Sequence, residues 1–308
     1  MEQLDIFSTV LTEESNTSNP KQAIKEKVIN AETVTQVKEK SNLHNYLDAM
    51  VEKYKIPDFI TNDPLRFPYR YTDVKDQEVM GFIAAMMAQG KRTSIVASLE
   101  KLENMMEKSP YKFVTEFDLD IHAERFKDFN HFAYKNIPGT DIVAIIFLLK
   151  QVLNQYGSIK NLFLEGLDPS KQKNVKEALI HFTEKIFSFA PPPDMLEIPS
   201  RIKSLLPNPN KGSACKRLNM FLRWVVRKDN VDIGIWSEVP TSMLLIPLDF
   251  HVSKLSRELG LTSRKQDDWK TAEEITERLK QFDPNDPAKY DFAIFGMGIA
   301  GERPFVPQ

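Results

Sequence analysis

Hydrophobic residues recur along this chain mainly at the three- and four-residue spacing of amphipathic helices, and strand-like alternation is rare. In one segment they form a broad apolar face of Val79, Phe82, Ile83, Met86 and Met87. The pattern predicts helices over Leu43–Lys55, Lys75–Gln89, Thr93–Met106, Thr140–Gln155, Asn174–Phe189, Ala214–Arg227, His251–Leu259 and Thr271–Gln281. The expected fold class is therefore all-α.

The beginning of the chain differs in composition from the rest. Residues 8–41 are rich in Ser, Thr, Asn, Glu and Lys and poor in aromatic residues. Such a segment lacks the apolar surface needed to offset the entropy lost on ordering. We therefore expect residues 1–42 to be a disordered N-terminal tail and residues 43–308 to form a helical domain.

The composition excludes several classes of site. The chain has a single cysteine, Cys215, which rules out a disulfide framework and a four-cysteine iron–sulfur cluster. Its five histidines show no metal-ligand spacing, so no metal or cofactor is expected. The N-terminus lacks a signal-peptide pattern, and no apolar run reaches membrane-spanning length. We expect a monomer in the cytoplasm that is not associated with a membrane.

Basic residues are unevenly distributed along the chain. The formal net charge of −2 does not by itself indicate nucleic-acid binding. From Arg201 to Asn230, however, there are eight Lys or Arg residues and one acid, Asp229. Because phosphate attraction depends on the local surface, this segment is a candidate DNA-binding region.

A turn in this basic segment has features of a phosphate-binding site. The sequence PNPNKGS opens a predicted helix, with Ser213 as its expected N-cap. Backbone N–H groups at such a turn can bind phosphate. Lys216, Arg223 and Arg227 follow at helical spacing and predict a basic edge. The alternative is a solvated basic face on a core helix.

Two further segments carry candidate chemistry. In Glu238–Gly260 an apolar run ends at Asp249, immediately before a predicted helix. Asp249 is either an ordinary N-cap or a catalytic carboxylate at the mouth of a cleft, and spacing does not choose between them. In Glu78–Leu99 a tight turn at residues 89–92 joins two predicted helices. That turn is either a structural hairpin or a ligand-facing corner.

Together these segments resemble a known superfamily. IPLDFHVSKLSRELGL is similar to the signature that carries the catalytic Asp in helix-hairpin-helix DNA glycosylases, and LPNPNKGSA is similar to their hairpin. EVMGFIAAMMAQGKRTS resembles the early helix pair of endonuclease III-like enzymes. The chain thus resembles the HhH-GPD superfamily, in particular a bacterial branch classed as a domain of unknown function. The resemblance implies a two-lobed helical domain whose cleft binds double-stranded DNA.

Departures from the superfamily pattern change what is expected of the site. Asn208 and Asn210 replace the hairpin glycines, and both tolerate left-handed backbone. Gly212 stands where the hairpin lysine is expected. The cysteines of the iron–sulfur loop are absent at the corresponding C-terminal segment. The separation of Lys216 from Asp249 is similar to the longer spacing in archaeal 8-oxoguanine glycosylases.

The resemblance gives Asp249 the role of stabilising the positive charge that builds on the sugar as a base leaves. Lys216 is either an amine that forms a Schiff base and then cuts the strand, as an AP lyase does, or a phosphate ligand with water as the nucleophile. Nearby cations such as Arg217 and Arg223 would favour the neutral, nucleophilic amine. Both mechanisms remain open.

The same resemblance implies how DNA is held. The expected DNA contacts are Gln89, Lys91, Arg92, Asn208, Asn210, Lys211, Gly212, Ser213, Arg217, Arg223 and His251. Gln89 resembles the residue that fills the gap left by an extruded base. Aromatic candidates for the base pocket are Phe221, Trp224, Trp236 and Phe250, although such residues more often belong to a core. The alternatives are a non-catalytic helix-hairpin-helix DNA-binding protein and a purely structural helical protein. The excised base, and the choice between DNA repair and defence against phage, are not readable from the residues.

The extreme N-terminus contains a separate candidate motif. Residues Gln3, Leu4, Asp5, Ile6 and Phe7 read QLDIF, which resembles the peptide that binds the bacterial sliding clamp. Such a segment places aliphatic and aromatic side chains in an apolar groove, while the amide fixes the register. A chance pentapeptide is the alternative. The sequence therefore predicts a tethered interaction with the clamp.

Overall fold

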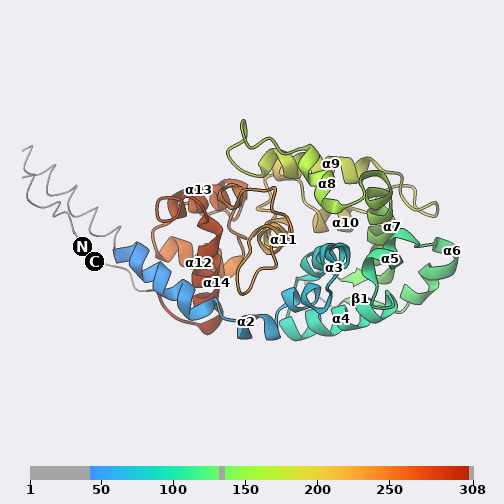
Figure 1. Ribbon diagram of the computed structural model, residues 1–308, viewed down its shortest axis with the longest axis horizontal. Coiled ribbons are helices and arrows are strands. Elements are labelled where there is room, and N and C mark those ends of the chain that lie inside the picture. Colours follow the sequence, from blue (N-terminus) through green and yellow to red (C-terminus); the bar gives the residue numbers. More distant parts are fainter. Residues whose placement is uncertain (1–41, 132–135, 305–308) are drawn as a thin grey trace, which may run out of the picture. The chain divides into compact units, whose positions relative to one another are not determined.

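The computed structural model describes residues 42–131 and 136–304 (Figure 1). The predicted tail up to residue 41, including the clamp-binding peptide, lies outside the described residues. Within them the protein is mostly helical, which confirms the all-α class, and residues 46–306 form a compact unit. The described strands β1 (Asn130–His131) and β2 (Ile137–Pro138) pair antiparallel.

The helices follow the hydrophobic pattern closely. A helix covers residues 42–54. The others are α2 (Asp58–Thr61), α3 (Val74–Met87), α4 (Arg92–Met105), α5 (Pro110–Thr115), α6 (Leu119–His122), α7 (Gly139–Tyr156), α8 (Ile159–Glu165), α9 (Lys176–Ser188), α10 (Ser200–Leu205), α11 (Lys216–Val226), α12 (Phe250–Glu258), α13 (Trp269–Leu279) and α14 (Asp291–Ala300). In the described part of the chain no single helix is long and apolar enough to span a membrane, although the bent pair α7 and α8 together meets the length and composition test. All predicted helices are present, whereas α14 and the short helices α2, α5, α6, α8 and α10 were not predicted from the pattern.

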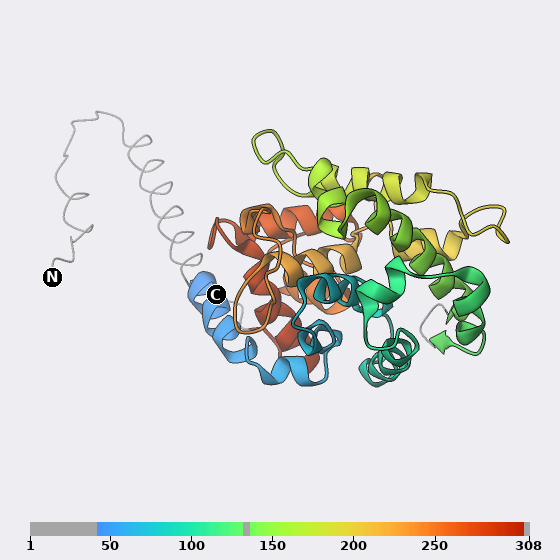
Figure 2. The ribbon, with the colours of Figure 1, turned by 45° about the vertical axis from the view of Figure 1, so that its right-hand side comes forward.

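Helix α11 lies in the interior, with α3 on one side and α12, α13 and α14 on the other (Figures 1 and 2). Its apolar stripe packs on α3, where Phe221 meets Phe82 edge to face with ring centroids 5.3 Å apart. Phe221 also contacts Trp236, again with centroids 5.3 Å apart. Both residues are buried core. The expectation that they line a base pocket is therefore wrong.

Trp236 also donates a hydrogen bond to a buried carboxylate. Glu78 of α3 accepts hydrogen bonds from the backbone N–H groups of Ile159 and Lys160, at 2.8 and 3.0 Å, and from Trp236 Nε1 at 2.9 Å. The carboxylate therefore caps the start of α8, where the helix dipole favours negative charge. Burial nevertheless raises the pKa of Glu78 above its ordinary value, with the three hydrogen bonds opposing the shift.

Close packing between α12 and α14 depends on a glycine. A Cβ atom at Gly298 would lie only 2.6 Å from Cβ of His251. No ordinary side chain fits at that distance, so the missing Cβ lets the two helices approach. This contact brings α14 against the start of α12, where Asp249 lies.

Candidate active site

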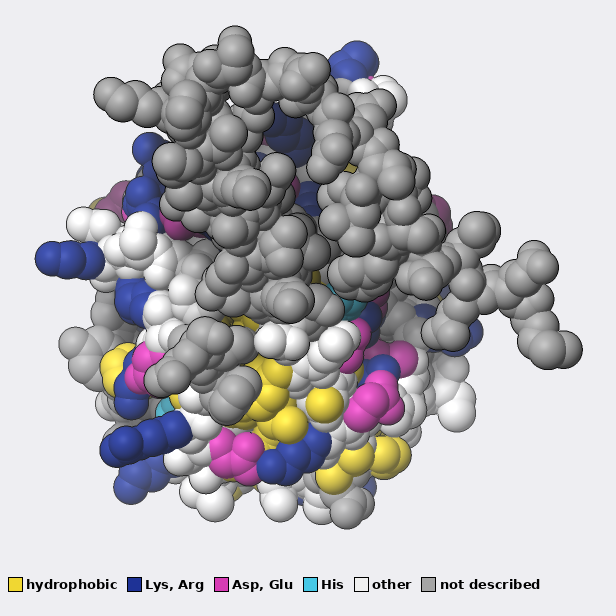
Figure 3. All heavy atoms as spheres, turned by 90° about the vertical axis from the view of Figure 1, so that its left-hand side faces the viewer, with side chains coloured by type: hydrophobic (Ala, Val, Ile, Leu, Met, Phe, Trp, Pro, Cys, Tyr) yellow, Lys and Arg dark blue, Asp and Glu magenta, His cyan; other side chains and the backbone are white. Residues whose placement is uncertain are grey.

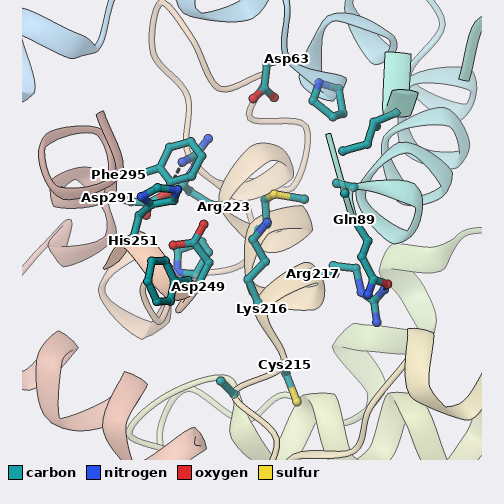
Figure 4. Close-up of a pocket in the computed structure, with 18 of the residues that line it drawn as sticks. Asp63, Gln89, Cys215, Lys216, Arg217, Arg223, Asp249, His251, Asp291 and Phe295 are labelled. Carbon is teal, nitrogen blue, oxygen red and sulfur yellow. Dashed lines mark hydrogen bonds and ion pairs between the residues drawn. The ribbon is translucent and has the colours of Figure 1, made fainter. Parts of the chain in front are cut away.

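The predicted motifs meet around one cavity of about 690 Å³. Its walls are the corner between α3 and α4, the first turns of α11, the start of α12, and α14 (Figure 4). In the close-up, Gln89 and Arg217 lie together on one side and Asp249, His251 and Asp291 on the other, with Lys216 between them. A cavity of this volume is within the range that holds small ligands.

Asp249 is both a helix cap and a cavity residue. Its Oδ1 accepts a hydrogen bond from the Val252 N–H at 2.9 Å, which makes it the N-cap of α12. It is partly exposed and lines the cavity. The two interpretations of Asp249 therefore do not compete, because one carboxylate oxygen caps the helix and the other is left for a ligand.

The hairpin forms with a different local geometry from the one expected. Helix α10 leads through the short 3-10 helix η4 (Pro209–Lys211) to α11, whose N-cap is Cys215 and not Ser213. Asn208 has a φ of −81°, and Asn210 does not have positive φ either. The left-handed positions of the turn are Gly212, with φ of 79°, and Cys215, with φ of 49°. The asparagines that replace the hairpin glycines therefore do not use the left-handed backbone that they tolerate.

The N–H groups of this turn are largely used within it. The Asn210 N–H donates to Asn208 Oδ1 at 2.8 Å, and the Lys211 and Gly212 N–H groups donate to carbonyls of the turn at 3.0 Å each. Ser213 Oγ accepts from the Cys215 N–H at 3.1 Å. In this conformation these four N–H groups are not free to bind a phosphate, whereas the start of α11 has no side-chain cap.

The predicted basic edge of α11 is a buried ion-pair cluster. Arg223 is 3% exposed and pairs with Asp291, and its Nε lies 3.4 Å from Asp232 Oδ1. Arg227 is also buried and pairs with Asp232 and with Asp286, the latter at 2.8 Å. Both guanidinium groups are neutralised by carboxylates. Arg223 lines the cavity but is buried and paired, so it is not the free cation expected beside Lys216.

Other cations remain available at the surface of this region. Lys91 and Lys211 are exposed, and Lys216 is partly exposed and lines the cavity. Arg92 also lines the cavity, 3.6 Å from Asp63. On the face shown in Figure 3, basic and acidic side chains are interspersed around a patch of hydrophobic side chains. The described residues of this face therefore form no broad basic stripe.

Gln89 is held firmly at the corner after α3. Its Oε1 accepts a hydrogen bond from Arg217 Nη1 at 3.0 Å, and Arg217 Nη2 also donates to the Ser204 carbonyl at 2.6 Å. The Gln89 carbonyl lies 3.0 Å from Nε2 of the buried His131, whose Nδ1 lies 2.9 Å from Ser98 Oγ. Burial lowers the pKa of His131, so the ring is neutral at pH 7 and donates from Nε2. Arg217 is thus a hydrogen-bond donor to Gln89 in this conformation.

Aromatic side chains line part of the cavity. Of the four base-pocket candidates, Trp224 and Phe250 reach it. Trp224 is 1% exposed and its Nε1 has no hydrogen-bond partner among the described residues, whereas Phe250 is 72% exposed. Phe295 of α14 also lines the cavity and contacts the His251 ring, with centroids 6.4 Å apart. The cavity therefore offers apolar ring surface beside polar groups.

Comparison with protein families gives a match over most of the chain. The family described as a protein of unknown function (DUF2400) matches residues 63–300. This chain belongs to the DUF2400 family. The DUF2400 match runs from the segment before α3 to the end of α14 and so includes every wall of the cavity. Comparison with curated proteins and with solved structures finds no match.

Sequence motifs missed several polar residues of the DUF2400 cavity, of which Asp291 is the most buried. Asp291 opens α14, lines the cavity and pairs with Arg223. No motif drew attention to it, because its partner lies 68 positions earlier in the chain. Among the described residues, no group of His, Cys, Asp and Glu is arranged to hold a metal ion. The polar side chains of this cavity include carboxylates, guanidinium groups, a lysine, an amide, an imidazole and hydroxyls.

Proposed function

We propose that this protein is a DNA glycosylase that removes a damaged or modified base from duplex DNA, with Asp249 as the catalytic carboxylate. The observation that supports the proposal most is the meeting of Asp249, Lys216 and Gln89 at one open cavity. These residues come from three separate segments, each of which resembles a glycosylase motif. A non-catalytic DNA-binding protein needs the hairpin but has no use for a cavity that contains a carboxylate and an amine.

In the proposed reaction the target nucleotide leaves the duplex and its base enters the cavity. Gln89, at the corner after α3, would fill the gap once it exchanges its hydrogen bond with Arg217 for contacts with DNA. As the C1′–N bond breaks, positive charge builds on the sugar. The Asp249 carboxylate stabilises that charge, because a fixed charge in a partly desolvated site needs little reorganisation.

The test is base release from duplexes that carry uracil, oxidised, alkylated or hypermodified bases. Asn is about as good an N-cap as Asp, so Asp249→Asn keeps the start of α12 intact. We expect the variant to lose at least ~100-fold in excision rate. Its affinity for DNA should stay close to that of the wild-type protein. Excision at the wild-type rate by purified Asp249→Asn protein would refute the assignment.

Asp268 offers a matched control. It is the N-cap of α13, and its Oδ1 accepts from the Thr271 N–H at 2.9 Å, as Asp249 Oδ1 does from Val252. Asp268 does not line the cavity. Asp268→Asn should therefore leave excision unchanged. Equal losses in the two variants would indicate a structural effect of removing a helix-capping charge.

Lys216 distinguishes two forms of the mechanism. If its amine attacks the sugar, borohydride should trap a covalent adduct between the active enzyme and DNA, and Lys216→Met should abolish the adduct. If water attacks, Lys216→Met should weaken DNA binding and give no change in trapping. Absence of an adduct with active wild-type enzyme would exclude the lyase mechanism.

A further inference from the structure

Asp291 is a buried carboxyl group with unused hydrogen-bonding capacity. Its side chain is 4% exposed and lines the same cavity as Asp249 (Figure 4). Asp291 Oδ2 accepts from Arg223 Nη1, whereas Oδ1 is buried and has no hydrogen-bond partner among the described residues. Leaving such an atom unpaired costs about 1–3 kcal/mol, so a vacant buried oxygen in a cavity needs an explanation.

Asp291 belongs to a cluster with more acids than cations. Four carboxyl groups share the two buried guanidinium groups of α11, in contacts that join Arg223 to Asp232 and Asp291, and Arg227 to Asp229, Asp232 and Asp286. Asp229 and Asp286 reach solvent, with side chains 17% and 28% exposed, whereas Asp232 and Asp291 are enclosed with the two arginines. Because burial is costly for a charged group, Asp291, which is enclosed and has one unpaired oxygen, is placed to hold a proton.

The surroundings of Asp291 favour that proton at a functional pH. Burial raises the pKa of Asp291 to about 6; Arg223 and Lys216 from α11 oppose the shift, and the Asp249 carboxylate adds to it. The other titratable groups that line this cavity include His251 of α12 and Asp63, which precedes the 3-10 helix η1 (Pro64–Arg66). Burial also raises the pKa of Asp232 to about 6, but Asp232 does not line the cavity.

We propose that Asp291 is a second catalytic carboxyl group, which protonates the departing base. The inference rests on the proposed glycosylase activity. When the C1′–N bond breaks, its electron pair stays with the base, and the Asp291 proton moves to the base. Water or the Lys216 amine adds to C1′ and gives one proton to Asp249. Asp291 is left as a carboxylate paired with Arg223, and exchange with solvent returns both carboxyl groups to their starting states.

Two carboxyl groups in unlike environments are a recurrent arrangement for breaking glycosidic bonds. Asp249 caps a helix and is partly exposed, which suits a group that must be ionised. Asp291 is enclosed beside other acids, which suits a group that must hold a proton. These separate roles of Asp249 and Asp291 predict which substrates need Asp291. A neutral base requires a proton to leave, whereas a cationic N-alkylated purine already carries the charge.

The experiment compares single-turnover excision of a neutral modified base and of 7-methylguanine from the same duplex sequence. Asp291→Asn should slow release of the neutral base by at least ~100-fold and of 7-methylguanine by less than ~10-fold, as expected for loss of a general acid. Between pH 5 and pH 9, wild-type release of the neutral base should fall as the pH rises above about 6, because Asp291 loses its proton. Asp291→Asn should lack that decline, and Asp291→Glu should retain it.

Asp232→Asn is the matched control. Asp232 is as deeply buried as Asp291 and pairs with the same Arg223, but it is not in the cavity. It should destabilise the protein without changing the ratio of the two excision rates. If Asp291→Asn and Asp232→Asn alter that ratio equally, or if Asp291→Asn keeps the wild-type pH profile, the proposal fails.

A second measurement does not depend on activity. A carboxyl titration by ¹³C NMR should find two groups that titrate near pH 6 in wild-type protein, Asp291 and Asp232. Asp291→Asn should remove one of the two titrations and Asp232→Asn the other, which assigns each signal to its residue. A wild-type Asp291 that titrates below pH 4 would overturn the proposal even if the protein excises bases. Conversely, a proton-holding Asp291 in a protein that releases no base would count against the glycosylase function alone.

Discussion

The buried ion-pair cluster gives a prediction for stability that can be worked from its contacts. Arg223→Met replaces a guanidinium with an apolar chain of similar length. It leaves Asp291 without the partner of its Oδ2 and removes a cation–π contact, in which the guanidinium carbon lies 4.4 Å from the Phe292 ring centroid. Breaking a buried ion pair by removing one partner costs about 3–5 kcal/mol. We therefore expect the free energy of unfolding at pH 8 to fall by about 4 kcal/mol.

The cost should depend on pH in a defined direction. Without Arg223, the stranded Asp291 carboxyl holds its proton more tightly, so its folded-state pKa rises further above that of the unfolded chain. A raised folded-state pKa contributes stability that is present below the unfolded pKa and lost as the pH rises through the folded pKa. The wild-type value is about 6. The deficit of Arg223→Met relative to wild type should therefore shrink as the pH falls from 8 to 5.5.

The assay is urea denaturation followed by circular dichroism, for wild type and variant at both pH values. Arg217→Met is the matched control, because Arg217 is also a largely buried cation of α11 but donates to an amide and a carbonyl, not to a carboxylate. Burial lowers the pKa of Arg217 to about 10. Arg217→Met leaves no buried carboxylate without its cation. The decrease in the free energy of unfolding that it causes should therefore be the same at both pH values. A cost below ~1 kcal/mol for Arg223→Met, or a cost independent of pH, would refute the reasoning.

Two further predictions concern single contacts, and a third concerns the N-terminal motif. Trp236→Phe removes one of three donors to the buried carboxylate of α3 and should cost about 2 kcal/mol in urea denaturation; no change would mean that water replaces the indole. Gly298→Ala places a Cβ 2.6 Å from Cβ of His251 and should lower the Tm by about 4 °C in a thermal melt; an unchanged or raised Tm would contradict the close-approach argument. In the tail, Ile6→Ala with Phe7→Ala should abolish calorimetrically detected binding to the host sliding clamp, and equal binding by wild type and variant would end that hypothesis.

Much of the fold follows from the hydrophobic pattern, because an amphipathic helix records its buried face in its own sequence. Helix α3 is predicted over Lys75–Gln89 and found at Val74–Met87, and α13 is predicted over Thr271–Gln281 and found at Trp269–Leu279. Helix α14 was missed for a physical reason. Its sequence DFAIFGMGIA is apolar on nearly every side and contains glycines that normally disfavour helices. Gly298 is required because His251 of α12 packs against it. Nothing in the sequence of α14 itself therefore indicates that a glycine is needed at this position.

The candidate site was predictable only in the parts that carry motifs. Gln89, Lys216 and Asp249 come from motif segments, and the structure brings all three to one cavity. That Arg223 is buried and paired with carboxylates was not predictable from motifs. Helical spacing indicated a basic edge, but whether a cation faces solvent or a carboxylate depends on residues that the fold brings from elsewhere. Its partners Asp232 and Asp291 lie in a loop and in the unpredicted helix.

That limit also shows why the surroundings of Asp291 matter more than the number of acids around α11. Of the four carboxyl groups that pair with its arginines, Asp229 and Asp286 reach solvent, with side chains 17% and 28% exposed, and Asp232 does not line the cavity. Asp291 is enclosed, lines the cavity, and has an Oδ1 with no hydrogen-bond partner among the described residues. Burial raises its pKa to about 6, so a proton held there can reach a ligand. The same contacts that bury α11 thus place a protonatable group on the same side of the cavity as Asp249.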